Sequence, residues 1–229
     1  MILKIGTYNI AHGAFADLDM SLLGKDIKEA GLDIVGLQEV DRNTARVFGR
    51  DTLLELQKAS GLGYRRYCKT IDLQGGVYGH AMLSRFPLLS YRRLPLPMLE
   101  GGKDTEPRCV ALATLSVEGK PFTFANTHLC WGASAAREAQ FALLQSTLSA
   151  PYILTGDFNI TDFSEYEVLT GAARVNRKEA PIYSFHGFDE GPHLPIDNVI
   201  FTPEFRLVDV ALQDVRHSDH YMLTATLEF

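Results

Sequence analysis

Short apolar runs, some alternating with polar residues and some continuous, are spread along the whole chain, and this pattern is typical of β-strands. Strands are predicted at residues 2–9, 33–38, 64–70, 78–84, 88–94, 108–117, 121–128, 151–155, 196–201, 206–213 and 221–228. Helical spacing of apolar residues predicts helices at 18–30, 52–60, 135–149 and 162–170. Two of them have candidate caps, Asp51 for the second helix and Ser134 for the third.

The balance of these elements predicts the fold class. Strands outnumber helices, and hairpin-like pairs at 108–128 and 196–213 favour a mixed α/β (α+β) protein over an unbroken series of βαβ units. Glu-Gly-Lys at 118–120 is expected to turn the first hairpin. Because no linker or repeat interrupts the sequence, residues 1–229 are predicted to form one domain, with surface loops at 99–107 and 171–193.

The overall composition agrees with a globular domain. The chain has 229 residues, of which 46% are hydrophobic, so it can bury a substantial core. Its formal net charge is −6. This charge counts against a tight, non-specific duplex binder, because such proteins need basic surfaces to neutralise phosphates. A metal site would itself add carboxylates, so nucleic acid stays open as a substrate.

Cysteine usage and the amino terminus bear on location. The three cysteines, Cys68, Cys109 and Cys130, are widely spaced and show neither a metal-type pair nor a disulfide framework in the sequence. Reduced thiols in a cytoplasmic protein are therefore expected. The first residues have no signal-peptide layout, and no apolar run approaches the ~20 residues of a membrane span. We expect no transmembrane segment, and a monomer.

A series of polar residues stands at or just after the predicted strands. These residue types suit a divalent cation and a phosphate, because hard cations prefer oxygen ligands and histidines serve as acids, bases or cationic clamps. The series is Asn9 in Thr-Tyr-Asn-Ile, Glu39 in Leu-Gln-Glu-Val, His128 in Asn-Thr-His-Leu, Asp157 and Asn159 in Gly-Asp-Phe-Asn, Asp197 in Ile-Asp-Asn-Val-Ile, and Asp219 and His220 in Ser-Asp-His.

Each motif has a plainer alternative. Glu39 is suited to hold Mg²⁺ at a sheet rim, but it can equally be a solvated residue at a strand end. Asp157 can orient a water and Asn159 can donate to phosphate, whereas an Asp/Asn turn is the ordinary interpretation. His220 works best as acid, base or clamp if a carboxylate such as Asp197 holds its other ring nitrogen, but a satisfied loop histidine is also common. Only the joint occurrence of the motifs, in this order, favours a site.

In that order, from Thr7 to His220, the motifs resemble the endonuclease/exonuclease/phosphatase superfamily. The resemblance implies a four-layer αββα sandwich with two mixed, mostly antiparallel sheets, and Mg²⁺ or Mn²⁺ as cofactor. It also implies roles. Glu39 resembles the main metal ligand, with Asn9 and Asp219 as close or water-mediated supports. Asp157 resembles the residue that positions the attacking water, Asn159 and His128 resemble phosphate contacts, and His220 paired with Asp197 resembles the histidine at the scissile phosphate.

Further residues are candidates for substrate binding. His80 and Arg108 lie in secondary motifs of the superfamily, although many relatives have Asn at the position of His80. Arg42 begins a four-residue spacing with Arg46 and Arg50 that forms a basic stripe if this loop is helical; an ordinary solvated face is the alternative. Trp131 could stack on a base or touch a lipid, or simply pack, and His186 resembles a stretch of compact bacterial relatives.

The sequence as a whole predicts a divalent-metal-dependent phosphoesterase, a hydrolase that cleaves phosphodiesters with an activated water. Its substrate partner is a small molecule, a lipid headgroup or a nucleic acid. Three alternatives stay open: a DNA endonuclease, exonuclease or repair enzyme of the same superfamily; a sugar or inositol phosphomonoesterase; and a catalytically inactive ligand-binding domain.

Overall fold

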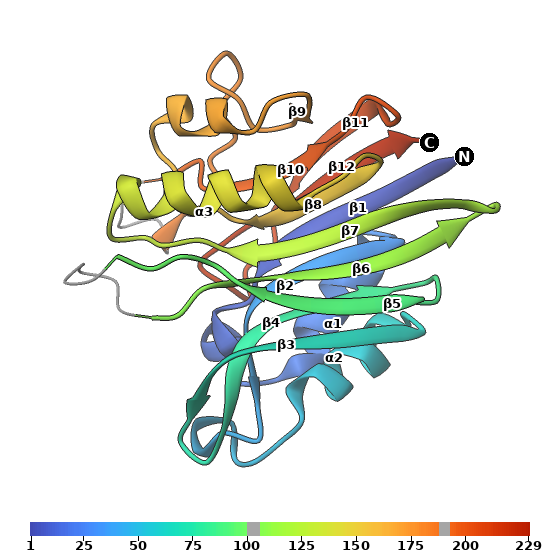
Figure 1. Ribbon diagram of the computed structural model, residues 1–229. Helices are drawn as coiled ribbons and strands as arrows, with labels where there is room; N and C mark the ends of the chain where they lie inside the picture. Colours follow the sequence, from blue (N-terminus) through green and yellow to red (C-terminus); the bar gives the residue numbers. More distant parts are fainter. Residues whose placement is uncertain (100–105, 188–192) are drawn as a thin grey trace.

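Two six-stranded β-sheets lie face to face in the computed structural model, which describes residues 1–99, 106–187 and 193–229 (Figure 1). The first sheet has the order β11-β12-β1-β2-β4-β3, built from Arg206–Gln213, Met222–Glu228, Ile2–Asn9, Ile34–Arg42, Gly76–Ser84 and Tyr64–Leu73. The second has the order β5-β6-β7-β8-β10-β9, built from Ser90–Pro95, Cys109–Val117, Lys120–His128, Tyr152–Asp157, Asp197–Phe201 and Ala173–Arg174.

Helices cover the outer faces of both sheets. Helices α1 (Met20–Glu29) and α2 (Thr52–Ser60) pack through a buried apolar cluster on the first sheet. Helix α3 (Ser134–Thr147) and the 3₁₀ helix Phe163–Val168 pack through another cluster on the second sheet, and a third cluster fills the space between the sheets. Further 3₁₀ segments lie at Ala11–Ala16 and Ala45–Val47. The predicted four-layer sandwich is confirmed.

Strand direction brings chain segments to one edge of the sandwich. β1 pairs with β2 and β7 pairs with β8 in parallel, whereas the other strand pairs are antiparallel. The carboxyl ends of two parallel neighbours meet at the same sheet edge. Hydrogen bonding between Asn9, at the end of β1, and Asp157, at the end of β8, shows that both sheets present this edge on the same side of the molecule.

The two predicted hairpins have different outcomes. β6 and β7 form the first, and Glu118 and Gly119 turn it with positive φ values of 51° and 80°, as a tight two-residue turn requires. The prediction of a hairpin at 196–213 is wrong, because β10 and β11 belong to different sheets. Between them Phe205 packs into the core between the sheets, edge-on to Phe122, and this contact carries the chain across.

Smaller differences concern the ends of helices and loops. Ser134 is the first residue of α3 rather than its cap, and Ala133 in the cap position makes no side-chain hydrogen bond. The helix predicted at 162–170 is a 3₁₀ helix that Asp162 caps through the Ser164 N–H. The predicted loops at 99–107 and 171–193 lie partly outside the described residues. Within residues 1–99, 106–187 and 193–229, no helix is long and apolar enough to cross a membrane.

A polar network is buried where the two sheets meet. The Gln38 side chain donates to Asn126 Oδ1 at 2.7 Å, and Asn126 donates to the carbonyls of Leu37 and Ala81 on the opposite sheet. Gly36 faces this network, and a Cβ atom there would collide with the side chains of Asn126 and Thr155. These hydrogen bonds fix how the sheets lie on each other just below the edge described above.

Candidate active site

Glu39 is aimed by a β-bulge. The pairing of β2 with β4 shifts register between Leu37 and Val40, and Glu39 has a φ of 57°, in the left-handed region that non-glycine residues rarely adopt. A bulge turns a side chain away from the regular alternation of a strand. Here it leaves the Glu39 side chain partly exposed at the sheet edge, beside a hollow, whereas Gln38 and Val40 are buried.

Asn9 connects two carboxylates from different sheets. Its Nδ2 atom donates to Glu39 Oε1 and to Asp157 Oδ2, both at 3.1 Å. Its Oδ1 atom accepts from the Ala11 N–H at 3.0 Å, which fixes the orientation of the amide. Asn9 therefore turns its nitrogen, rather than its oxygen, toward the carboxylates and holds them close together.

Asp157, Asp197 and His220 form the buried centre of the site. Asp157 and Asp197 are directly opposite each other in the antiparallel pair of β8 and β10. His220 Nδ1 lies 2.7 Å from Asp197 Oδ2, and His220 Nε2 lies 3.8 Å from Asp157 Oδ2. The other oxygen of Asp197 is buried without a hydrogen-bond partner among the described residues. The imidazole is thus held between two acids, one of which fixes its orientation.

Protonation states follow from this geometry. Burial alone would lower the pKa of His220, but Asp197 and Asp157 more than offset it and raise this pKa to about 10. Burial and the Asp197 charge raise the pKa of Asp157 above its usual range. Burial would also raise the pKa of Glu39, but His12, His128 and Asn9 lower it to about 2. At neutral pH the site therefore holds a cationic His220 and an ionised Glu39.

His128 and Asn159 complete the wall on the side of the second sheet. His128 ends β7, and its Nε2 lies 3.5 Å from Asp157 Oδ2. Burial, helped by the Arg108 charge, holds the pKa of His128 well below its usual range, so this ring is neutral. Asn159 donates one amide hydrogen to the Leu129 carbonyl at 3.0 Å, and its backbone N–H donates to Asp157 Oδ1. An amide nitrogen has two hydrogens, which leaves one for a ligand.

All of these side chains except Asn9 and Asp197 line one hollow of about 340 Å³ at the sheet edge. Asp219 lines it beside His220, Arg108 lines it while paired with Glu106 at 3.1 Å, and Trp131 is 58% exposed at its margin. Glu39 and Asp219 supply two carboxylates in this hollow, and hard divalent cations prefer such oxygen ligands. The hollow therefore combines carboxylates that could hold a cation with donors suited to a phosphate.

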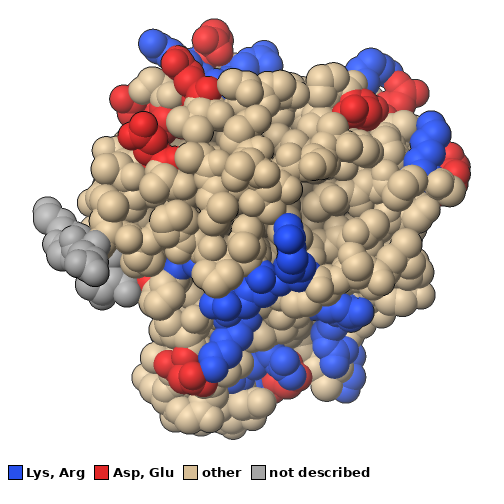
Figure 2. Space-filling view, viewed as in Figure 1, with Lys and Arg blue, Asp and Glu red and all other residues tan. Residues whose placement is uncertain are grey.

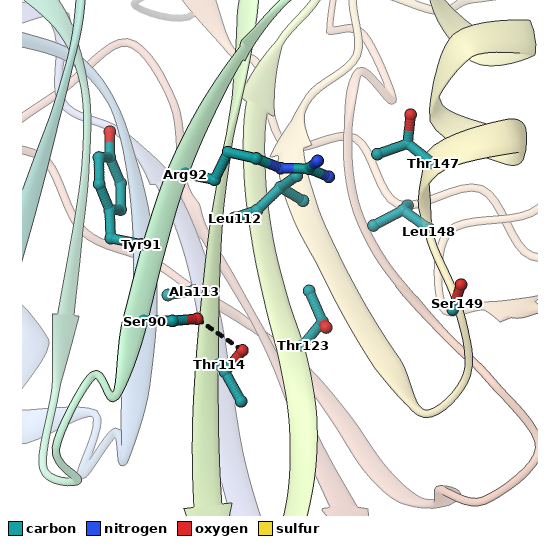
Figure 3. Close-up of a pocket in the computed structure, with 10 residues that line it drawn as sticks. All are labelled: Ser90, Tyr91, Arg92, Leu112, Ala113, Thr114, Thr123, Thr147, Leu148 and Ser149. Atoms are coloured by element: carbon teal, nitrogen blue, oxygen red, sulfur yellow. Dashed lines mark hydrogen bonds between the residues drawn. The ribbon is translucent and has the colours of Figure 1, made fainter.

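A second hollow lies on the outer side of β5, β6 and β7, next to the end of α3 (Figure 3). It measures about 410 Å³, and hydroxyl groups such as Thr114 and Ser149 line it together with Arg92. The described residues that line it include no carboxylate and no histidine. Although this hollow is larger, it lacks the groups needed for metal-assisted hydrolysis.

Positive charge gathers on one face of the molecule over β3 and β5 (Figure 2). These strands carry Arg65, Arg66, Lys69, Arg92 and Arg93. None of these five side chains lines the hollow around Glu39 and His220. The protein therefore has a local basic surface despite its net charge of −6. Its residues lie on β3 and β5, the edge strands of the two sheets, where charged side chains can remain in solvent.

Three further predicted residues do not line the hollow. His80 and His186 are buried, and their Nε2 atoms lie 3.0 Å from the carbonyls of Cys109 and Ser218, respectively. Arg42 lies on β2, where it forms a two-point ion pair with Asp51. The prediction of a helical stripe of arginines is wrong, because Arg42 belongs to a strand and Arg46 to a 3₁₀ segment. The Arg46 guanidinium forms a two-point ion pair with Asp41.

Other residues of the site were not foreseen. His12 Nδ1 lies 3.9 Å from Glu39 Oε2, too long for a hydrogen bond, and both Tyr78 and Glu106 line the hollow. Ala11 and His12 have positive φ values of 43° and 47°. The position of His12 beside Glu39 depends on this backbone turn, and no local sequence pattern predicts such a turn. Tyr78 stood within a predicted strand, and only its pairing with Asp41 of β2 brings it near Glu39.

The fold and this constellation define a member of the Endonuclease/Exonuclease/phosphatase family. A model of that family matches residues 6–220, so the chain belongs to it. Members of this family are hydrolases that act on phosphate esters. No match was found among curated proteins.

Solved structures with the same fold cover the whole chain. An endonuclease/exonuclease/phosphatase from Beutenbergia cavernae is 26% identical with a TM-score of 0.82, covering 100% of this chain and 72% of that one. The mannosyl-6-phosphatase of Bacteroides thetaiotaomicron is 19% identical with a TM-score of 0.73, covering 99% and 100% of the two chains. D. rerio TDP2, complexed with a single-strand DNA product, is 18% identical with a TM-score of 0.75, covering 100% and 99%.

Proposed function

We propose that the protein is a Mg²⁺- or Mn²⁺-dependent phosphodiesterase in which a water is the nucleophile. One observation carries this proposal: Asp157 and the His220 ring that Asp197 holds share a single hollow with the Glu39 and Asp219 carboxylates. Such a hollow can hold the cation, the phosphate and the water side by side. Intact acids and histidines argue against an inactive binding domain. The three free cysteines fit a reducing compartment, so we also propose a cytoplasmic location.

Glu39 and Asp219 are the proposed metal ligands. Glu39 is ionised, has a partly exposed side chain and is oriented by Asn9, and Asp219 reaches the same hollow from the loop before β12. Two carboxylates and free space for water suit Mg²⁺ or Mn²⁺, which keep several waters when bound. When present, the metal would neutralise negative charge on the phosphate and on the leaving oxygen.

The remaining residues would act on the water and the phosphate. Asp157 has a raised pKa, so it can take a proton from the attacking water and hold it. His220 is cationic and fixed by Asp197, which suits it to bind a phosphate oxygen whose charge grows in the transition state. Neutral His128 and the second amide hydrogen of Asn159 would donate to other phosphate oxygens.

Sugar phosphates and nucleic acids remain alternative substrates, because proteins with this fold differ in what they act on or bind. The mannosyl-6-phosphatase is named as a phosphatase, and TDP2 was solved with single-strand DNA product. The hollow itself is small, about 340 Å³, and its lining includes one exposed aromatic residue, Trp131. This volume lies at the lower end of the roughly 300–1,000 Å³ typical of small-molecule sites and is compatible with either a compact diester or a sugar phosphate.

A metal-dependent substrate screen tests the proposal. Bis-p-nitrophenyl phosphate, phospholipid headgroup diesters, sugar phosphates and nicked or abasic DNA would be compared with Mg²⁺, with Mn²⁺ and with chelator. Turnover of diesters that requires metal is expected, and Glu39→Gln should abolish it and weaken Mg²⁺ binding. Glu118→Gln, in the hairpin turn between β6 and β7, is a matched control that should leave turnover unchanged. Unchanged turnover in Glu39→Gln would contradict the proposed metal-dependent mechanism.

A further inference from the structure

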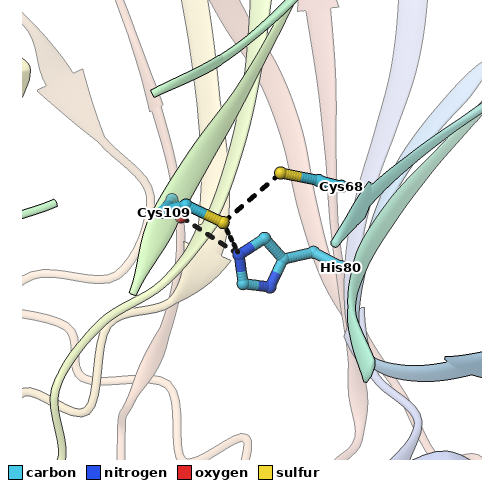
Figure 4. Close-up of side chains that lie close together, drawn as sticks. All are labelled: Cys68, His80 and Cys109. Carbon is cyan, nitrogen blue, oxygen red and sulfur yellow. Dashed lines mark hydrogen bonds between the residues drawn. The ribbon is translucent and has the colours of Figure 1, made fainter. Parts of the chain in front are cut away.

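Two thiols and one imidazole converge between the sheets (Figure 4). Cys68 comes from β3, His80 from β4 and Cys109 from the start of β6, so the cluster joins both sheets. The two sulfur atoms lie 3.4 Å apart, and His80 Nε2 lies 3.3 Å from Cys109 Sγ. All three residues are at most 2% exposed.

We propose that Cys68, His80 and Cys109 bind one Zn²⁺ ion. Thiolate sulfur and imidazole nitrogen are the ligands that zinc prefers in structural sites, and here one potential ligand atom from each residue lies within 4.8 Å of the others. Mg²⁺ prefers oxygen ligands. The two metals would therefore occupy different sites of this protein, and the zinc proposal does not depend on the proposed catalytic function.

The distances in the cluster favour a metal over a disulfide. Zn–S bonds of about 2.3 Å in a tetrahedral site place two sulfur atoms about 3.8 Å apart. The observed 3.4 Å separation needs an expansion of about 0.4 Å to reach that value. A disulfide requires about 2.05 Å, so the sulfur atoms would have to approach by about 1.4 Å across two packed sheets.

Charge balance also favours a zinc ion in this buried place. Binding would release the protons of Cys68 and Cys109 to solvent, and two thiolates would then neutralise the charge of Zn²⁺. His80 would coordinate through Nε2 as a neutral ring with its proton on Nδ1, and would give up the hydrogen bond that Nε2 donates to the Cys109 carbonyl. The bound site would carry no net charge, which removes the main penalty for burying an ion.

An oxygen beside the cluster can complete four-fold coordination. Thr70 Oγ1 lies 3.6 Å from Cys109 Sγ, and the carbonyl of Cys109 lies 3.0 Å from His80 Nε2. Both oxygens are candidates for the fourth position, although the Cys109 carbonyl already accepts a hydrogen bond from Thr127 Oγ1 at 3.0 Å. Structural zinc sites almost always have four ligands, so the fourth position would fall to one of these oxygens or to a water.

The site would tie together elements that also shape the catalytic hollow. Arg108, directly before Cys109, and Tyr78, two residues before His80 on β4, both line that hollow. A zinc ion would link β3 and β4 to β6 just behind these two residues. We therefore expect zinc to raise the thermal stability of the protein as well as to bind stoichiometrically.

Metal titration of the reduced, chelator-stripped protein tests the proposal. Co²⁺ and Cd²⁺ serve as probes in the presence of excess Mg²⁺, because thiolate-to-metal charge-transfer absorption arises only from sulfur ligands. The band of either probe is expected to saturate at one metal per chain and to be absent in Cys68→Ser and Cys109→Ser, and the Co²⁺ band is expected to disappear on addition of Zn²⁺. Cys130→Ser removes a buried thiol elsewhere in the chain and should keep the band.

The wild-type protein alone can overturn the proposal, whatever the folding of the variants. Absence of a one-to-one sulfur band, or no rise in melting temperature with stoichiometric Zn²⁺, would contradict it. A band that survives in Cys68→Ser but is lost in Cys130→Ser would place the metal elsewhere. A Cys68–Cys109 disulfide in the purified protein, with no zinc uptake after reduction, would identify the pair as a redox couple instead.

Discussion

The Nδ1 atom of His220 lies 2.7 Å from Oδ2 of Asp197, although 23 residues separate them in the sequence. Asp197 is fully buried, and its carboxylate reaches the ring from the first position of β10. The contact fixes which nitrogen of the ring faces the hollow: Nε2 points toward Asp157, at 3.8 Å from Oδ2. Asp197 thus controls both the orientation and the charge of His220.

Asp197→Asn should reduce turnover strongly while leaving metal binding intact. The amide keeps the size of the side chain but cannot hold a cationic imidazole, and a comparable change in serine proteases lowers kcat by about 10⁴. We expect a loss of about 10²- to 10⁴-fold in kcat on the best diester found, with an unchanged Mg²⁺ dependence. Asp209→Asn, on the exposed surface of β11, is the control. Equal turnover in the two variants would contradict the role of Asp197.

Much of the fold could be predicted because strand periodicity is a local signal. Apolar runs located the strands, and the turn at Glu118 and Gly119 was apparent from its residue types. The sheet to which each strand belongs is not local. The hairpin at 196–213 was wrong because its direction is set by the packing of Phe205 between the sheets, which no pattern within the segment records.

The candidate site shows the same division. Motif order brought out the acids and histidines, and the structure gathers Glu39, Asp157 and His220 around one hollow. The sequence contained no pattern that would place His12 at the site, because its position depends on a backbone turn with positive φ. Nor did the sequence indicate that Cys68 and Cys109, 41 residues apart, would lie with their sulfur atoms in contact. Such pairs arise only when two sheets pack.

Gly36→Ala should destabilise the protein without touching the catalytic groups. The new methyl group would collide with Asn126 and Thr155 in the buried network between the sheets. Overpacking of this kind typically costs about 1–3 kcal/mol, and urea unfolding would measure it. Gly63→Ala offers a matched control, because a Cβ atom there meets nothing within 4 Å. Full stability of Gly36→Ala would mean that the sheets can separate slightly at this point.

Asp51→Ala should destabilise the protein at neutral pH and less so in acid. Asp51 accepts from the Leu54 N–H at the start of α2 and binds Arg42, and loss of such a cap costs about 0.5–2 kcal/mol. Partial burial would raise the pKa of Asp51, but Arg42 and the Leu54 N–H more than offset this and lower it. The stabilisation is therefore present above the unfolded pKa, about 3.9, and is lost as pH falls through the folded pKa.

Urea unfolding of wild type and Asp51→Ala across this pH range would measure the effect. The difference in unfolding free energy should narrow as the pH falls below about 4. Asp51→Asn keeps an acceptor for the helix but not the charge, so it should retain most of the capping stability with a weaker pH dependence. A gap between wild type and Asp51→Ala that is constant with pH would show that the ionised carboxylate contributes nothing.

Trp131→Ala should discriminate between large and small substrates. The indole is 58% exposed at the margin of the catalytic hollow, where it can stack on a base or pack on the leaving group of a large diester. Stacking of this kind contributes about 1–3 kcal/mol, so kcat/KM for such a substrate should fall about 5- to 150-fold. For a small diester with no aromatic group, which gives the indole nothing to stack on, kcat/KM should hardly change. Phe48→Ala removes an aromatic ring that is 80% exposed and does not line the hollow, so it should affect neither substrate. An equal loss for both substrates in Trp131→Ala would show that the ring supports the wall of the site instead of contacting the substrate.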